Sequence, residues 1–167
     1  KIFAPSKINT QGLHSRMGDF LTEELSALVD RPTITGDAIK HYKKLCDGKR
    51  AIIFCVSIEH SKHVVAQFNG AGIPAAHVDG ETDVMIRDRE IKRFEAWDIK
   101  ILSNVELFGE GFDLPAMEAV IMLRPTQSLG MYIQQTGRVL RPSPGKECAI
   151  ILDHAGNCER HGLPDEE

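Results

Sequence analysis

Residues 51–56 form the segment that most limits the possible folds, because the run Ala-Ile-Ile-Phe-Cys-Val contains no charged or strongly polar side chain. A strand with one solvent-facing side alternates apolar and polar residues, whereas a strand covered by helices on both faces is apolar throughout. Similar short runs occur at residues 74–78, 99–103, 118–123 and 148–152, separated by segments with helical periodicity. This alternation predicts a three-layer α/β fold with a mostly parallel sheet and helices on both faces.

The first fifty residues are less regular. Apolar residues from Phe20 to Leu28 predict a helix within residues 17–29, and Ile39, Tyr42 and Leu45 predict a second one that Asp37 would cap. We interpret residues 1–49 as a helical connector or N-terminal extension packed on the domain. Residues 50–155 are the α/β domain itself, and residues 156–167 are a tail that leads to further sequence. Because the chain begins at Lys1 and not at a methionine, we expect it to be part of a longer protein.

Composition excludes some classes of function. The formal net charge is −4, which argues against a protein that grips nucleic acid by bulk positive charge but leaves room for a local basic site. No apolar run reaches the eighteen residues that a membrane span needs, so no membrane partner is expected. The four cysteines form no C-x-x-C pair, which favours a reducing, cytoplasmic setting.

No metal site is expected from the potential ligands. His60, His63 and His77 lack the spacing of metal ligands. Asp153, His154, Cys158 and His161 lie close together in sequence but match no standard zinc pattern.

Polar residues follow several of the predicted strands. In a parallel sheet, ligands bind beyond the carboxyl ends of the strands, so these positions are candidate binding residues. They are Ser57, Asp79, Gly80, Ser103 and Asn104. Each of them also has an ordinary interpretation as a turn residue or a helix cap. The loop after Asn104 contains Gly111 and Asp113, where glycine permits close backbone approach and the carboxylate can accept hydrogen bonds from a ribose.

The run QQTGRVLRP at residues 134–142 is the strongest candidate for chemistry. Gln134, Arg138 and Arg141 stand at i, i+4 and i+7 of a predicted helix, with Thr126 as its expected N-cap, and therefore project from one stripe. Leu129, Ile133, Thr136 and Leu140 form a second, mostly apolar stripe roughly 130° away, which we expect to pack on the core. Two guanidiniums aimed away from a core suit a phosphate, whose oxygens they can pair with bidentately.

The ordered set of segments resembles the second RecA-like domain of superfamily 2 helicases over about residues 50–155. The strand with Phe54 resembles their motif IV, and the stretch from Ser103 to Asp113 resembles motif V, although Val105 stands near the place of the usual threonine. Gln134-x-x-Gly137-Arg138-x-x-Arg141 matches motif VI in full. The helix with Arg87, Arg89 and Phe94 resembles the Arg-x-x-x-x-Phe helix that precedes motif V. Phage-type and restriction-type helicases are the most similar subgroup.

The resemblance implies a P-loop NTPase helicase domain 2 that works with a first RecA-like domain on the same chain. Residues 1–167 contain no Gly-x-x-x-x-Gly-Lys-[Ser/Thr] and no apolar strand ending in Asp-Glu, so most contacts to ATP and Mg²⁺ are expected on that upstream domain. The fragment alone should be inactive.

The resemblance also implies a role for each matching residue. Arg138 and Arg141 would be arginine fingers and Gln134 would orient water or touch the γ-phosphate. Gly111, Asp113 and Gly137 would lie at the nucleotide. The polar residues at the strand ends would contact single- or double-stranded nucleic acid, with DNA favoured.

Two alternatives from other classes stay open. The chain could be a non-catalytic α/β module that binds a nucleotide or a protein through the arginine helix. It could also be an enzyme that uses the same fold for another phosphate-bearing substrate, although no nucleophile–base pair stands out in the sequence.

Overall fold

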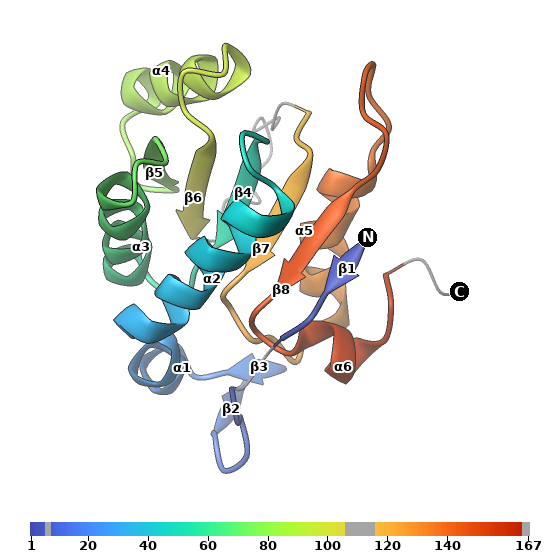
Figure 1. The fold of residues 1–167 in the computed structure, drawn as a ribbon. Helices are drawn as coiled ribbons and strands as arrows, with labels where there is room; N and C mark the ends of the chain where they lie inside the picture. Colours follow the sequence, from blue (N-terminus) through green and yellow to red (C-terminus); the bar gives the residue numbers. More distant parts are fainter. Residues whose placement is uncertain (6–7, 106–115, 165–167) are drawn as a thin grey trace.

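The protein is described by a computed structural model, which covers residues 1–5, 8–105 and 116–164. Its centre is a six-stranded, fully parallel sheet in the order β1-β8-β7-β4-β6-β5 (Figure 1). The strands are β1 (Ile2–Phe3), β4 (Ala51–Phe54), β5 (Ala75–Asp79), β6 (Ile101–Val105), β7 (Ala119–Met122) and β8 (Ile150–Asp153). A small antiparallel hairpin, β2 (Ser15–Arg16) and β3 (Asp19–Phe20), lies apart from the sheet.

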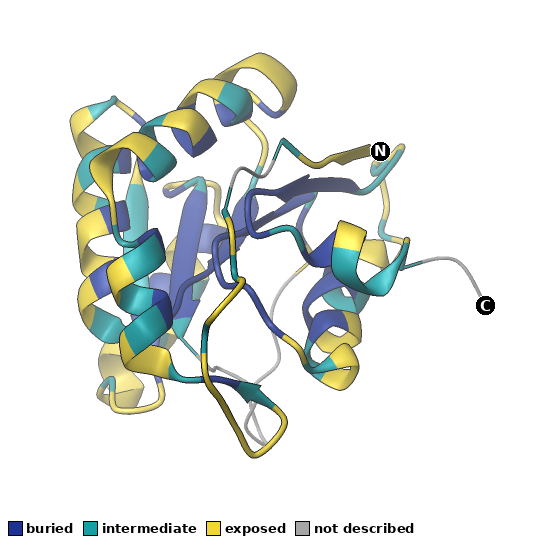
Figure 2. Ribbon diagram, turned by 90° about the horizontal axis from the view of Figure 1, so that it is seen from below, coloured by how far each residue is buried: buried dark blue, intermediate teal, exposed yellow. Residues whose placement is uncertain are grey.

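Helices cover both faces of this sheet. The helices are α1 (Thr22–Val29), α2 (Pro32–Leu45), α3 (Ile58–Gly70), α4 (Val84–Glu95), α5 (Leu129–Leu140) and α6 (Asn157–His161). One apolar cluster joins α2 and α3 to one face of the sheet, and a second joins α4, α5 and α6 to the other. Figure 2 shows the buried strands between helices whose outer faces are exposed. The predicted three-layer α/β fold is therefore confirmed.

Strand β4 explains why the continuous apolar run was informative. Ile53 belongs to the cluster on the α2–α3 side, whereas Ile52 and Phe54 belong to the cluster on the other side. All four residues of the strand are buried. A strand with helices against both faces has no position for a polar side chain, so the alternation of an exposed sheet is absent.

The first fifty residues contribute to the sheet as well as to the helical layer. Strand β1 pairs with β8 at the sheet edge, with Ile2 opposite Ile151. Helix α2 begins at Pro32 and not near Asp37, so the predicted cap was wrong; proline is favoured in the first turn because it needs no hydrogen-bond acceptor there. None of the described helices has the length and apolar character that crossing a membrane requires.

Side-chain caps fix the helix starts that face the carboxyl ends of the strands. Ser57 caps α3 by accepting a hydrogen bond from the backbone N–H of His60, as predicted. Helix α5 is capped by Ser128, which accepts from the N–H of Met131, and not by Thr126. Thr126 instead accepts from the N–H of Ser128 and donates its hydroxyl to Asp19, so it holds the residues that lead into the helix.

Candidate functional site

The last two turns of α5 and the residue after them carry the motif VI side chains. Gln134 and Arg141 are exposed and Arg138 is half-buried. Together with Ile133 and Gly137 they line a shallow hollow. Among the described residues, none forms an ion pair or a hydrogen bond with the guanidinium of either arginine. Two guanidiniums without an acidic partner among the described residues suit a ligand with several negative charges, and the described residues that line the hollow include no carboxylate that could hold Mg²⁺.

The buried face of α5 differs from the predicted one. Tyr132, Gln135, Thr136 and Val139 are buried, whereas Leu129, Ile133 and Leu140 are 52%, 53% and 41% exposed. The packed stripe is thus the adjacent one, and only Thr136 was assigned correctly. Both stripes have helical spacing and apolar members, so periodicity could not choose between them. As a result, the arginines lie beside exposed apolar side chains.

The C-terminal turn of α5 is held by a residue that sequence reasoning missed. The Lys146 ammonium donates hydrogen bonds to the backbone carbonyls of Val139 and Arg141, the latter at 2.9 Å. Burial lowers the pKa of Lys146 from its ordinary value. Cations near a helix C-terminus satisfy its free carbonyls, so the lysine after the Pro-Gly turn was the available signal.

Gly137 lies in the hollow lined by Arg138 and Arg141, called the arginine hollow below, and has open space where a side chain would be. A Cβ at this position would meet no heavy atom within 4 Å among the described residues outside its own stretch of helix. Glycine inside a helix is unfavourable relative to alanine, so packing within the described residues does not explain its presence. The other two residues predicted to contact the nucleotide, Gly111 and Asp113, lie outside the described residues.

Ser57 follows the carboxyl end of β4, and Asp79 and Gly80 lie at the carboxyl end of β5. Gly80 is exposed, and Ser57 approaches Ser26 of α1 with an Oγ–Oγ distance of 3.2 Å. Asp79 is buried and accepts hydrogen bonds from His77 Nε2 at 2.5 Å and from the backbone N–H of Glu81 at 2.7 Å. Although burial raises the pKa of Asp79, these hydrogen bonds outweigh it and lower the pKa below its ordinary value.

Ser103 and Asn104 were predicted to contact nucleic acid, but both side chains are fully buried. Ser103 Oγ lies 2.6 Å from Ser61 Oγ, and Asn104 Nδ2 donates to the Ile53 carbonyl at 2.8 Å. Both side chains support β6 from inside the domain, and a contact of Ser103 or Asn104 with nucleic acid stays a prediction, as do the contacts of Ser57, Asp79 and Gly80.

Ser61, His77 and Asp79 have the connectivity of a serine–histidine–carboxylate triad. Ser61 Oγ lies 2.6 Å from His77 Nδ1, and His77 Nε2 contacts Asp79. Ser61 is however completely buried, so no substrate can reach its hydroxyl. The arrangement is a structural network and gives no support to the alternative of a second enzyme chemistry. Sequence reasoning missed it because its members come from a helix and a strand with no motif in common.

The potential metal ligands near the C-terminus have other partners. The Asp153 carboxylate accepts from the backbone N–H groups of Ala155 and Cys158, and His161 Nε2 contacts the Thr126 carbonyl. His154 stacks on His41 with ring centroids 5.1 Å apart. In the residues that the structure covers, no three histidine, cysteine or acidic side chains gather as metal ligands.

We expect His60 to make the stability of the domain depend on pH. Burial lowers the pKa of His60 to about 4, and its Nδ1 accepts a hydrogen bond from the Val56 N–H. The unfolded chain binds a proton near pH 6.5, so stability is full above that pH and is lost as the pH falls toward 4. We expect His60 alone to lower the free energy of unfolding by about 2 kcal/mol between pH 7 and pH 5.

Urea unfolding at both pH values would measure this effect against His60→Asn, whose amide oxygen can accept the same bond without titrating. The variant should lose less stability than the wild type over this interval. Equal losses in the two proteins would show that His60 is not the titrating group.

Residues 37–143 match the family model of the helicase conserved C-terminal domain, which includes the whole of the arginine hollow. The chain belongs to this helicase family. The superfamily 2 resemblance is thereby confirmed, as is the RecA-like character of the fold. The residues whose spacing resembles motif VI, Gln134, Gly137, Arg138 and Arg141, all line one hollow of this helicase domain.

Two curated relatives are much longer than this helicase domain. A "51.5 kDa protein" of a Lactococcus phage is 38% identical over 158 residues, which are 95% of this chain and 34% of that protein. A putative ATP-dependent helicase of Saccharomyces cerevisiae is 30% identical over 145 residues, covering 85% of this chain and 21% of that protein. The chain therefore spans about a third and a fifth of these relatives.

Solved structures agree with this helicase fold. The E. coli DEAD-box protein SrmB, in its complex with regulator of ribonuclease activity A, matches with a TM-score of 0.66 and 23% identity over 80% of this chain and 79% of that one. The C-terminal domain of the DEAD-box protein Dbp5 matches with a TM-score of 0.63 and 20% identity over 80% and 76% of the chains. At this identity the similarity shows the fold alone.

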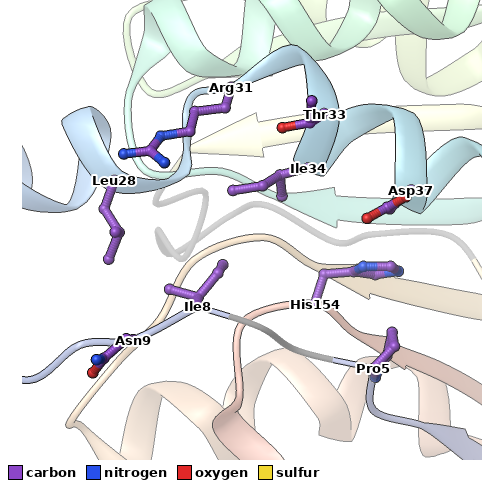
Figure 3. A pocket seen from close by; sticks show the side chains of 9 residues that line it. All are labelled: Pro5, Ile8, Asn9, Leu28, Arg31, Thr33, Ile34, Asp37 and His154. Atoms are coloured by element: carbon purple, nitrogen blue, oxygen red, sulfur yellow. The ribbon is translucent and has the colours of Figure 1, made fainter.

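A second hollow of the helicase domain lies between α2 and the segment around Ile8 (Figure 3). Its walls include Leu28 and Ile34, and its charged side chains are Arg31 and Asp37. Figure 3 shows that Arg31 extends toward Leu28 and away from Asp37, so the polar groups do not converge on one point. We assign this hollow no role in the function.

Proposed function

We propose that this domain is the motif VI half of an ATP-dependent nucleic-acid helicase or translocase. The observation that carries the proposal is the hollow on α5, where Arg138, Arg141 and Gln134 converge without an acidic partner among the described residues. By the family resemblance, a first RecA-like domain of the same protein faces this hollow. The exposed Ile133 supports that arrangement, because it lines the same hollow and, with the exposed Leu129 and Leu140 on the neighbouring stripe of α5, offers an apolar surface for another domain to cover.

The chemistry of this face is electrostatic stabilisation. The guanidiniums of Arg138 and Arg141 would pair with the γ-phosphate of ATP and stabilise the negative charge that develops during its transfer to water. An arginine in that role is worth about 10³–10⁵ in rate. Gln134 has a donor and an acceptor and would orient the attacking water. Mg²⁺, when bound, would neutralise phosphate charge, and we expect its ligands outside the hollow, whose described lining residues include no carboxylate.

The proposed nucleic-acid contacts lie at the other end of the domain. Helix α5 begins near the carboxyl ends of the strands and runs back along the sheet, so Arg138 stands roughly 15 Å from its start. Ser57, Asp79 and Gly80 lie at the carboxyl ends, where backbone N–H groups and small polar side chains can hold the phosphates of a strand. Loss of the γ-phosphate contacts would open the cleft between the domains and move this edge along the strand.

We infer DNA as the substrate from the phage- and restriction-type resemblance of the motifs. Relatives of this chain include proteins named as DNA helicases and proteins named as RNA helicases. The four cysteines are unpaired, which supports our inference of a reducing, cytoplasmic setting. We expect the 167-residue chain alone to hydrolyse almost no ATP.

The test of the proposed function is ATP turnover by the full-length protein with and without single-stranded DNA, repeated with single-stranded RNA. Turnover that rises with DNA and falls with added salt supports a DNA motor. Stimulation by RNA alone would overturn the choice of DNA. Absence of turnover with either nucleic acid, in folded protein, would leave a non-catalytic binding module.

Gly137→Ala separates stability from function at the arginine hollow. The new methyl group meets nothing within 4 Å, and alanine is the better helix former, so the free energy of unfolding should rise by roughly 0.5–1 kcal/mol. If ATP approaches the backbone at this point, the same methyl group should raise the KM for ATP severalfold. Urea unfolding and steady-state kinetics measure the two effects, and an unchanged KM would remove Gly137 from the nucleotide contacts.

A further inference from the structure

A chain of buried hydrogen bonds connects the turn after β5 to the strand β6. From Asp79, it passes through His77 at 2.5 Å, Ser61 at 2.6 Å and Ser103 at 2.6 Å, and it ends at Cys55 with a sulfur–oxygen distance of 3.3 Å. Ser61 and Ser103 are completely inaccessible and the Cys55 side chain is 1% exposed. Polar groups this deeply buried must satisfy one another, because water cannot replace a missing partner.

While the His77 ring is neutral, the number of hydrogen atoms fixes the direction of every hydrogen bond in this series. The ionised Asp79 can only accept, so His77 Nε2 must carry its hydrogen, and in the neutral ring Nδ1 is then an acceptor. The hydroxyl of Ser61 therefore donates to Nδ1.

The same argument assigns the donor and the acceptor in the two hydrogen bonds that follow Ser61. Its one hydrogen is already used, so Ser61 Oγ must accept from the hydroxyl of Ser103. Ser103 in turn can only accept from the thiol of Cys55. Burial raises the pKa of the Cys55 thiol to about 12, so this proton stays on the sulfur.

At the Asp79 end of this series of hydrogen bonds lies the turn that contains Gly80. One oxygen of Asp79 binds His77 and the other accepts from the backbone N–H of Glu81, while the N–H of Asp79 donates to Thr82 Oγ1. His77 thus fixes the orientation of the Asp79 carboxylate, and this carboxylate holds the turn through its bond to the Glu81 N–H. Gly80, between these contacts, is exposed and has open space around its Cα.

We propose that His77 is a positioning residue that acts through Asp79, orienting the turn so that Gly80 can meet a nucleic-acid phosphate. Asp79 selects the Nε2–H tautomer of His77, and that tautomer sets the direction of the hydrogen bonds through Ser61 to Ser103 and Cys55. The turn and strand β6 are thereby joined in one ordered network. The nucleic-acid phosphate as the ligand of Gly80 rests on the proposed function. The directions of the hydrogen bonds in the network do not.

The tautomer is tested by long-range ¹H–¹⁵N NMR of the 167-residue chain with labelled histidine, recorded above neutral pH. We expect His77 to show a protonated Nε2 and an unprotonated Nδ1. In Asp79→Asn, whose amide both donates and accepts, the other tautomer should appear. If Nδ1 of His77 is protonated in the wild type under these conditions, the inferred directions of the hydrogen bonds are wrong, whether or not the protein binds nucleic acid.

The positioning role is tested by the affinity of the full-length protein for labelled oligo(dT). His77→Phe, which keeps a ring but loses both hydrogen bonds, should weaken binding roughly tenfold. His77→Gln should recover most of the affinity, since its amide can donate to Asp79 and accept from Ser61. His14→Phe is the matched control, because His14 is exposed and its ring bonds, among the described residues, to Glu24 of α1, far in sequence from the turn after β5.

The outcomes separate this inference from the proposed function. Equal binding by wild type and folded His77→Phe would overturn the positioning role, as would equal weakening in the phenylalanine and glutamine variants. Failure of the wild type to bind either oligo(dT) or RNA would contradict the proposed nucleic-acid function and, with it, the role of Gly80, while the NMR result would still decide the order of the network.

Discussion

Replacing Arg138 by alanine in the full-length protein should lower kcat for ATP hydrolysis by about 10³-fold or more while leaving the affinity for ATP nearly unchanged. Arg138 is half-buried in the arginine hollow and has no acidic partner among the described residues, so its charge is available for a ligand. An interaction that forms mainly in the transition state affects kcat and not ground-state binding. Steady-state turnover and equilibrium binding of a labelled ATP analogue measure the two quantities.

Two substitutions make this result specific. Arg138→Lys keeps the charge but loses the planar fork, so we expect it to fail almost as badly if the contact is bidentate. Arg16→Ala removes an exposed arginine of the hairpin and should leave turnover unchanged. Turnover retained by Arg138→Ala would exclude the arginine-finger role, and near-normal turnover by Arg138→Lys would exclude the bidentate contact.

The sheet was predictable because its strands are buried on both faces. Runs such as Ala51–Phe54 contain enough apolar residues to be recognised without knowledge of the partner strand. Strand β1 was missed because it is a two-residue edge strand whose partner, β8, lies at the other end of the chain. Pairing over such a separation leaves no local pattern. The start of α2 was missed because Pro32 was not considered as a first-turn residue.

The candidate site was predictable only as far as local spacing determines it. The positions of Gln134, Arg138 and Arg141 on one stripe follow from helical geometry, and the structure places all three in one hollow. Which other stripe of α5 packs on the sheet depends on its neighbours, and there the prediction was wrong. The network of His77 and Ser61 had no sequence signal, because it forms only when a strand and a helix are brought together.

The second large effect is expected from Asn157, which holds the segment that enters α5. Asn157 is fully buried at the start of α6. Its Oδ1 accepts from the backbone N–H of Thr126 at 3.0 Å, and its Nδ2 donates to the carbonyl of Arg124 at 2.9 Å. Both backbone groups are buried between β7 and α5, so no water is available to them if the amide is removed.

Asn157→Ala should therefore lower the free energy of unfolding by about 2–4 kcal/mol, since each unsatisfied buried group costs roughly 1–3 kcal/mol. Urea unfolding measures this loss, and an unchanged m-value would show that the folded and unfolded states keep their compactness. Asn157→Asp keeps the acceptor for Thr126 and replaces the donor to Arg124 by a carboxylate oxygen that the Arg124 carbonyl repels, while Arg160, which already bonds to this side chain, offsets part of the new charge. We expect it to lose about half as much stability.

Equal losses in the two Asn157 variants would mean that the bond to Arg124 alone fixes this segment. A loss below about 1 kcal/mol in Asn157→Ala would mean that the segment finds other partners. If Asn157→Ala loses the expected stability, we also expect it to lower kcat in the full-length protein. The segment before α5 would be less well held, and α5 carries Arg138. A stability loss without any change in kcat would show that the packing of Tyr132 and Val139 is enough to keep the arginines in place.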